Sequence, residues 1–140
     1  WNTGRTGKIV AVAIFDAVGV RYAERVNGVD ALALMKIDVL DGLESLQVCT
    51  GYRYRGELIT EFPNEADILA ECQPVCETLP GWKEDTVGIV EERKLPANCQ
   101  AYLRRLESLA GIPLAIISTG PRRDQTIVRP SQLLKSWGLA

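Results

Sequence analysis

The stretch from Phe15 to Asp38, FDAVGVRYAERVNGVDALALMKID, decides the fold that we expect for this chain. Its first part carries apolar residues at every fourth position, Val18, Tyr22 and Val26. This spacing predicts an amphipathic helix, which Asp16 would cap at its start and Gly28 would end. The second part, Ala31 to Ile37, is an almost wholly apolar run of strand length. Such a run is typical of a strand that is covered on both faces in a parallel sheet.

The same order of helix and then strand returns near the other end of the chain. Pro96 suits the first turn of a helix that would run to Ala110, with Gly111 as its stop. A second apolar strand, Ile112 to Ile117, follows directly. These two units predict an α/β fold with a mostly parallel sheet flanked by helices.

The residues between the two units predict smaller elements. Strand-favouring residues from Gln47 to Tyr54 and from Glu57 to Phe62 are separated by Arg55-Gly56, which indicates an antiparallel β-hairpin that lies at a sheet edge or projects outward. The other expected elements are a short helix capped by Asn64, a strand from Val75 to Leu79 and a terminal helix around Leu133, Leu134 and Trp137. No repeat or linker separates these elements, so we expect residues 1–140 to form a single domain.

Composition excludes several classes of function. The 140 residues are 46% hydrophobic and 24% charged, a balance that allows a packed core. The chain has no histidine, which excludes a Ser-His-Asp triad, a Cys-His pair and an HExxH zinc site. The net charge of -2, with scattered Lys and Arg, gives no basis for binding nucleic acid. The longest apolar stretch, Ile9 to Phe15, is too short to span a bilayer, so we expect no membrane partner and a cytoplasmic location.

The cysteines favour a structural role. Cys49, Cys72, Cys76 and Cys99 could form two disulfides or one thiolate metal site, but a zinc ribbon needs paired CxxC knuckles. Only Cys72 and Cys76 lie close in the sequence, and their CxxxC spacing also differs from that of a thioredoxin-like redox motif. We therefore expect free thiols in the core, with a redox module as the less favoured interpretation.

Polar residues follow the carboxyl end of each apolar strand. Ligands of open α/β sheets bind at these ends. Lys36-Ile37-Asp38 ends the first strand, and Ser118-Thr119-Gly120 ends the second. A carboxylate such as Asp38 can accept hydrogen bonds from guanine N1–H and the 2-amino group, while the Lys36 stem lies along the base. Against adenine the same carboxylate would be unpaired. Backbone N–H groups of the second loop would reach guanine O6, since Gly120 allows close approach. By itself this pattern also fits a solvated strand end.

Several stretches together resemble one family. They are FDAVGVRYAERVNGVDALALMKIDVLDGLESLQVC from Phe15, CETLPGWKEDT from Cys76, LPANCQAYLRRLESLAGIPLAIISTGP from Leu95, and DQTIV from Asp124. KxDVLDG, ETLPGW and STGP in this order are similar to the carboxyl-terminal third of adenylosuccinate synthetase. The resemblance extends over most of the chain, to Val128.

The resemblance implies a purine-biosynthetic ligase that joins IMP and aspartate, using GTP and Mg²⁺, to give adenylosuccinate, GDP and phosphate. The fold it implies is part of a larger P-loop-like, GTP-dependent ligase, and members of the family are commonly homodimers. In that family the KxD motif and the STGP loop hold the guanine, which transfers to Lys36, Ile37, Asp38, Ser118, Thr119 and Gly120. Thr3, Gly4 and Arg5 resemble the end of the family's loop for aspartate and IMP.

The chain also departs from the family pattern. Met35 stands where Thr is usual, the stretch from Thr6 to Ile14 is longer than the family pattern and differs from it, and the last residues from Arg129 diverge. The family's phosphate loop, catalytic Asp, catalytic His and Mg²⁺ ligands lie upstream of the matched region. We therefore expect a fragment that recognises guanine and is inactive alone. A non-catalytic interaction domain that keeps the ligase fold is the alternative.

Overall fold

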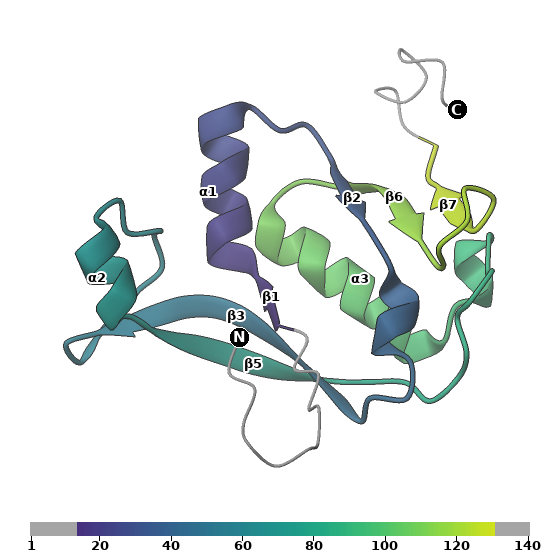
Figure 1. Cartoon of the computed structure of the whole chain (residues 1–140), viewed down its shortest axis with the longest axis horizontal. Helices are drawn as coiled ribbons and strands as arrows, with labels where there is room; N and C mark the ends of the chain where they lie inside the picture. The colour runs from purple at the N-terminus through teal and green to yellow at the C-terminus, as the bar shows by residue number, and fades with distance from the viewer. Residues whose placement is uncertain (1–13, 131–140) are drawn as a thin grey trace.

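The computed structural model describes residues 14–130, and its first unit follows the expected order of helix and strand (Figure 1). Strand β1, Ile14–Asp16, leads into helix α1, Ala17–Asn27. The carboxylate of Asp16 accepts hydrogen bonds from the backbone N–H groups of Val18 and Gly19, at 3.0 and 3.1 Å. Gly28 ends the helix in the left-handed conformation, at φ 62°. Both predicted ends of α1 are confirmed.

The first sheet is built around the long strand β3, Ser45–Tyr54. Strand β5, Gln73–Pro80, pairs antiparallel with it along almost its whole length. On its other side β3 pairs parallel with β1 and antiparallel with β4, Glu57–Ile59. The predicted hairpin is confirmed, because Arg55 and Gly56 form its turn with φ values of 49° and 91°.

The second sheet holds the two apolar strands that the sequence predicts. Strand β2, Leu32–Leu34, pairs parallel with β6, Leu114–Ser118, and β7, Thr126–Val128, adds an antiparallel edge. The α/β class is confirmed. The sheets are mixed rather than mostly parallel, however, because β1–β3 and β2–β6 are parallel whereas the β3–β4, β3–β5 and β6–β7 pairs are antiparallel.

Some boundaries differ from the sequence prediction. The first apolar strand ends at Leu34 instead of Ile37, because Lys36 takes a left-handed conformation that turns the chain out of the sheet. The short helix α2, Ala66–Glu71, is present, but Asn64 does not cap it; Glu65 occupies that position without a side-chain bond. Strand β5 contains the predicted strand, and β1 and β7 were not predicted. The predicted terminal helix lies outside the described residues.

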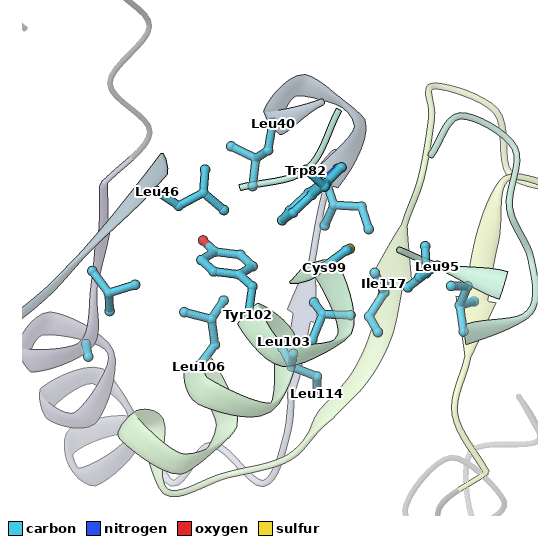
Figure 2. Close-up of a cluster of buried hydrophobic side chains, with 14 residues drawn as sticks. Leu40, Leu46, Trp82, Leu95, Cys99, Tyr102, Leu103, Leu106, Leu114 and Ile117 are labelled. Atoms are coloured by element: carbon cyan, nitrogen blue, oxygen red, sulfur yellow. The ribbon is translucent and has the colours of Figure 1, made fainter. Parts of the chain in front are cut away.

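Helix α3, Ala97–Ala110, connects the two sheets and confirms the second predicted helix. Figure 1 shows α3 between the long β3–β5 ribbon and the sheet formed by β2, β6 and β7. One buried cluster draws side chains from both sheets and from this helix. In Figure 2, Leu40, Leu46 and Trp82 gather around the ring of Tyr102, which comes from α3. The second sheet is thereby fixed against the first through α3.

The thiols lie in two places and none is paired with another. Cys99 is buried in the main cluster, and Cys49 is buried in a smaller cluster against which Cys72 and Cys76 pack. The prediction of free cysteines is confirmed for all of them, although Cys72 and Cys76 are only partly buried. Within the described part of the chain, no helix has the length and apolar character that crossing a membrane requires.

Candidate functional site

The structure brings the two predicted loops together at one edge of the second sheet. Strands β2 and β6 are parallel neighbours, and Leu34 is the register partner of Ile117. The residues that follow them, Lys36 to Asp38 and Ser118 to Gly120, therefore leave the sheet side by side. The 3-10 helix η1, Ile37–Leu40, which carries Asp38, also contacts β6. The site is thus formed by loops that lie 80 residues apart in the sequence, counted from position 38 to position 118.

The first loop holds a polar atom with an unmet hydrogen-bonding requirement. Among the residues that the structure describes, Asp38 Oδ1 is the one buried side-chain nitrogen or oxygen atom without a hydrogen-bond partner. Ile37 beside it is fully buried and anchors η1, while Lys36 is exposed with its backbone at φ 58°. A buried carboxylate oxygen without a partner is costly, and such an atom calls for a donor from elsewhere.

The second loop is buried and satisfies its own polar groups. The Ser118 hydroxyl donates to Gly120 O at 2.8 Å. The Thr119 amide donates to Gln125 O at 2.9 Å, and the Thr119 hydroxyl donates to Ile89 O at 2.9 Å. Both side chains are at most 2% exposed. The loop is therefore held by its own chain, and the side chains of Ser118 and Thr119 are engaged inside it.

Gly120 leaves room for the Gln125 side chain in this loop. A Cβ atom at position 120 would lie 2.8 Å from Cδ of Gln125, closer than real Cβ contacts allow. The Gln125 side chain occupies this position because its Oε1 accepts the Arg122 amide at 3.0 Å. The glycine thus lets the backbone pass directly under Gln125, whereas the expected close approach of this backbone to a base stays a prediction.

Comparison with known proteins decides the family. The family model described as adenylosuccinate synthetase matches residues 2–127 of this chain. The chain belongs to the adenylosuccinate synthetase family. It is 51% identical to the adenylosuccinate synthetase of Halorhodospira halophila over 126 residues, and 49% identical to that of Brevibacillus brevis over 123 residues. A chloroplastic adenylosuccinate synthetase of Ricinus communis is 49% identical over 114 residues.

A solved structure supports the same assignment. The chain resembles a fully ligated adenylosuccinate synthetase from Plasmodium falciparum with a TM-score of 0.78 and 34% sequence identity, over 83% of this chain. That alignment covers 28% of the Plasmodium chain. The matches to the Halorhodospira and Brevibacillus synthetases each cover 29% of the relative, so the chain spans less than a third of the length of these relatives.

The fold explains why two of the synthetase-like motifs carry the residues they do. Gly81 and Trp82 of ETLPGW follow β5, and a Cβ at Gly81 would lie 2.8 Å from the carbonyl carbon of Leu43. Trp82 is buried and donates its indole N–H to the carboxylate of Asp41, the second acidic residue of KxDVLDG, at 2.6 Å. These motifs therefore meet each other beside the candidate site.

Sequence reasoning missed three residues that shape this site: Asp41, Thr86 and Gln125. Asp41 and Thr86 are joined by hydrogen bonds, and Gln125 closes the second loop. All three lie inside the stretches that carry the resemblance, which is the signal that could have identified them. Their roles depend on contacts between segments distant in sequence, which no local pattern reports.

The structure does not describe the other predicted site residues. Thr3, Gly4 and Arg5 lie outside the described residues. Between residues 14 and 130, no group of three or more metal-ligating side chains could hold an ion.

Beneath the site, burial and the nearby charges of Asp41 and Glu92 raise the pKa of the Cys99 thiol to about 12. That cysteine therefore stays a neutral core residue near pH 7.

Proposed function

We propose that this chain is the guanine-recognising, carboxyl-terminal third of an adenylosuccinate synthetase, forming a single domain over residues 1–140. The whole enzyme would join IMP and aspartate in purine biosynthesis and convert GTP to GDP and phosphate. The observation that carries the proposal is the unpartnered buried Oδ1 of Asp38, beside the loop of Ser118 to Gly120.

The carboxylate of Asp38 has the chemistry that guanine recognition needs. An ionised carboxylate only accepts hydrogen bonds, and guanine presents two adjacent donors, N1–H and the 2-amino group. Adenine presents an acceptor where guanine has N1–H, so the carboxylate would then remain unpaired in a buried position. Asp38 Oδ1 has no partner among the described residues, so a base that reaches it would supply the donor that it lacks. The exposed stem of Lys36 is placed to cover one face of that base.

The second loop supplies the opposite edge of the proposed pocket. The Thr119 amide already donates to Gln125 O, so we assign the contact with guanine O6 to the amide of Gly120. Ser118 and Thr119 hold that amide in place through their buried hydroxyl groups. Asp38 then reads N1–H and the 2-amino group, and the Ser118–Gly120 loop holds the Gly120 amide opposite O6.

The other parts of the proposed enzyme follow from the family. Arg5, with Thr3 and Gly4, would contact aspartate and IMP. Mg²⁺ would act with GTP elsewhere in the whole enzyme, since the Mg²⁺ ligands are not expected in this chain. We further propose a cytoplasmic homodimer as the working form of the enzyme. Without the phosphate loop and the catalytic Asp and His, the chain alone should bind guanine nucleotides weakly and should not turn over.

A titration of the chain with GDP and with ADP tests this function. We expect GDP to bind at least about tenfold more tightly, because one unpaired charged hydrogen bond corresponds to about 1.5–3 kcal/mol. The variant Asp38→Asn should bind both nucleotides equally, whereas Asp67→Asn, an exposed carboxylate on α2, should behave as the wild type. Equal binding of both nucleotides by the wild type would contradict the guanine assignment and favour the alternative, a non-catalytic interaction domain.

A further inference from the structure

The carboxylate of Asp41 gathers two groups from a segment far along the chain. Its Oδ1 accepts the indole N–H of Trp82 at 2.6 Å, and its Oδ2 accepts the Thr86 amide at 2.7 Å. The Thr86 hydroxyl lies 2.9 and 3.0 Å from the two carboxylate oxygens. The next residue, Gly42, bonds to the same segment, because its amide donates to Trp82 O at 3.0 Å. This carboxylate is satisfied within the chain, unlike that of Asp38.

On one side, Asp41 is attached to the residue that we propose reads the base. Asp41 directly follows η1, and its amide donates to Asp38 O at 3.2 Å. The η1 turn is short, because Ile37–Leu40 is only four residues long. A displacement of Asp41 would therefore be transmitted to Asp38 within a single turn of helix.

On the other side, Thr86 is attached to the Ser118–Gly120 loop. The Ile89 amide donates to Thr86 O at 3.2 Å, and Ile89 O in turn accepts the Thr119 hydroxyl at 2.9 Å. The Gly88 amide donates to Thr119 O at 3.2 Å. The residues Thr86 to Ile89 thus lie directly against the second loop and bond to both the main chain and the side chain of Thr119.

These contacts form one continuous path between the two loops, and most of its side chains are buried. Thr86 and Thr119 are fully buried, and Trp82 is 2% exposed and packs against Tyr102 at 5.9 Å between ring centroids. Burial of Thr86 and Trp82 limits the competition of solvent for their donors, which strengthens their hydrogen bonds to the partly buried Asp41.

We propose that Asp41 and Thr86 form a brace that fixes the distance between Asp38 and the Ser118–Gly120 loop and thereby sets the preference for guanine. The proposal rests on the guanine function assigned above. A purine is rigid, so the groups that hold its two edges must keep their separation to within about 0.5 Å. Asp41 and Thr86 are positioning residues, because neither is expected to touch the nucleotide.

The first test compares the GDP and ADP affinities of brace variants by NMR-detected titration of the full chain. We expect Asp41→Asn and Thr86→Val to reduce the GDP-to-ADP preference at least about fivefold, mainly by weakening GDP, since two misplaced loops contact the base less well. Thr86→Ser keeps the hydroxyl and should retain the preference. Val48→Ala, at a fully buried position of β3, is the control for a general loss of stability and should leave the preference unchanged.

The second test needs no nucleotide and separates the brace from the function on which it rests. Amide hydrogen exchange at Gly88 and Thr119, whose N–H groups are bonded in the second loop, should become at least about tenfold faster in Asp41→Asn. It should stay unchanged in Asp38→Asn, and Val48→Ala should change exchange throughout the molecule instead.

The outcomes decide the two proposals separately. Loss of preference together with faster exchange at Thr119 supports the brace. An unchanged preference in Asp41→Asn, or unchanged exchange at Gly88 and Thr119, overturns it. If the wild type binds GDP and ADP equally, the guanine function fails and the selectivity role fails with it, while the exchange result still shows whether Asp41 couples the two loops.

Discussion

The two loops of the candidate site differ in how far the chain satisfies their polar groups. In the Ser118–Gly120 loop, both hydroxyl groups and the Thr119 amide have partners within the chain, and the loop is buried. In the Lys36–Asp38 loop, a buried carboxylate oxygen has none, and Lys36 adopts a left-handed backbone conformation. The side-chain polar groups of the Ser118–Gly120 loop are satisfied by the folded chain itself, whereas the Lys36–Asp38 loop has a carboxylate oxygen that a ligand could satisfy.

Because of this difference, we expect substitutions in one loop to change the free energy of unfolding and substitutions in the other to change nucleotide binding. Substitutions in the satisfied loop and its supports should cost folding free energy, because they remove interactions that the folded chain already makes. Substitution of Asp38 should cost recognition and leave folding intact, because its unpartnered oxygen makes no stabilising interaction and is itself costly to bury. Measurements of both properties on the same variants therefore test the comparison directly.

The largest effect is expected at Gly81, which precedes Trp82 and lies against the main chain of Leu43. A Cβ in Gly81→Ala would meet the main chain of Leu43, which cannot yield as a flexible side chain could. We expect the free energy of unfolding to fall by about 3 kcal/mol or more, measured by urea denaturation. Gly19→Ala is the control, because its Cβ would make ordinary contacts of 3.4 Å within α1 and should be neutral or stabilising.

The second effect concerns the satisfied loop itself. Thr119→Val keeps the shape of the side chain but removes the hydroxyl that donates to Ile89 O. We expect a loss of about 1–3 kcal/mol in urea denaturation, since Ile89 O would lose its partner. The same change at the exposed Thr78 of β5 should have no measurable cost. A Thr119→Val variant as stable as the wild type would show that this loop is not held as described.

Unlike Thr119→Val, a substitution of Asp38 should not destabilise the fold. In Asp38→Asn the free energy of unfolding should be unchanged or should rise by up to about 1 kcal/mol, because a neutral amide costs less to bury than an unpaired carboxylate oxygen. The nucleotide preference should nevertheless be lost. If Asp38→Asn were destabilised as much as Thr119→Val, the two loops would not differ in the way proposed.

The smallest effect is a difference in thiol reactivity. Burial raises the pKa of Cys99 to about 12 and that of Cys49 to about 11, so both stay protonated at pH 8. Cys72 and Cys76 are only partly buried and should react first with a disulfide reagent. Because Cys99 lies in the cluster that contains Trp82, Asp41→Asn should speed its modification severalfold and leave Cys49 unchanged. Equal acceleration at both would indicate general unfolding instead of local opening.

Local patterns in the sequence were sufficient to predict much of this fold. Asp16 and Gly28 mark helix ends through their own side-chain and backbone preferences, and Gly111 ends α3 for the same reason. The two apolar runs predicted strands of a parallel sheet, and the structure pairs them as neighbours, which places both candidate loops at one sheet edge. The candidate site could be predicted because each loop immediately follows its strand.

The features that were missed depend on contacts between distant segments. Strands β1 and β7 are three residues each and become strands only by pairing with β3 and β6. Asp41 looks like the start of a turn in the sequence, but its carboxylate is bound by Trp82 and Thr86, more than 40 positions away. The early end of β2 depends on the backbone of Lys36, whose left-handed conformation a non-glycine residue seldom adopts.

The central claim, that Asp38 reads the guanine edge, is tested most directly by comparing GDP with inosine diphosphate. The two bases differ only in the 2-amino group, which is one of the donors assigned to this carboxylate. The wild type should bind GDP about tenfold more tightly, as expected for one charged hydrogen bond, and Asp38→Asn should reduce this ratio toward one. Equal affinity of the wild type for both nucleotides, or a ratio that survives Asp38→Asn, would contradict the account.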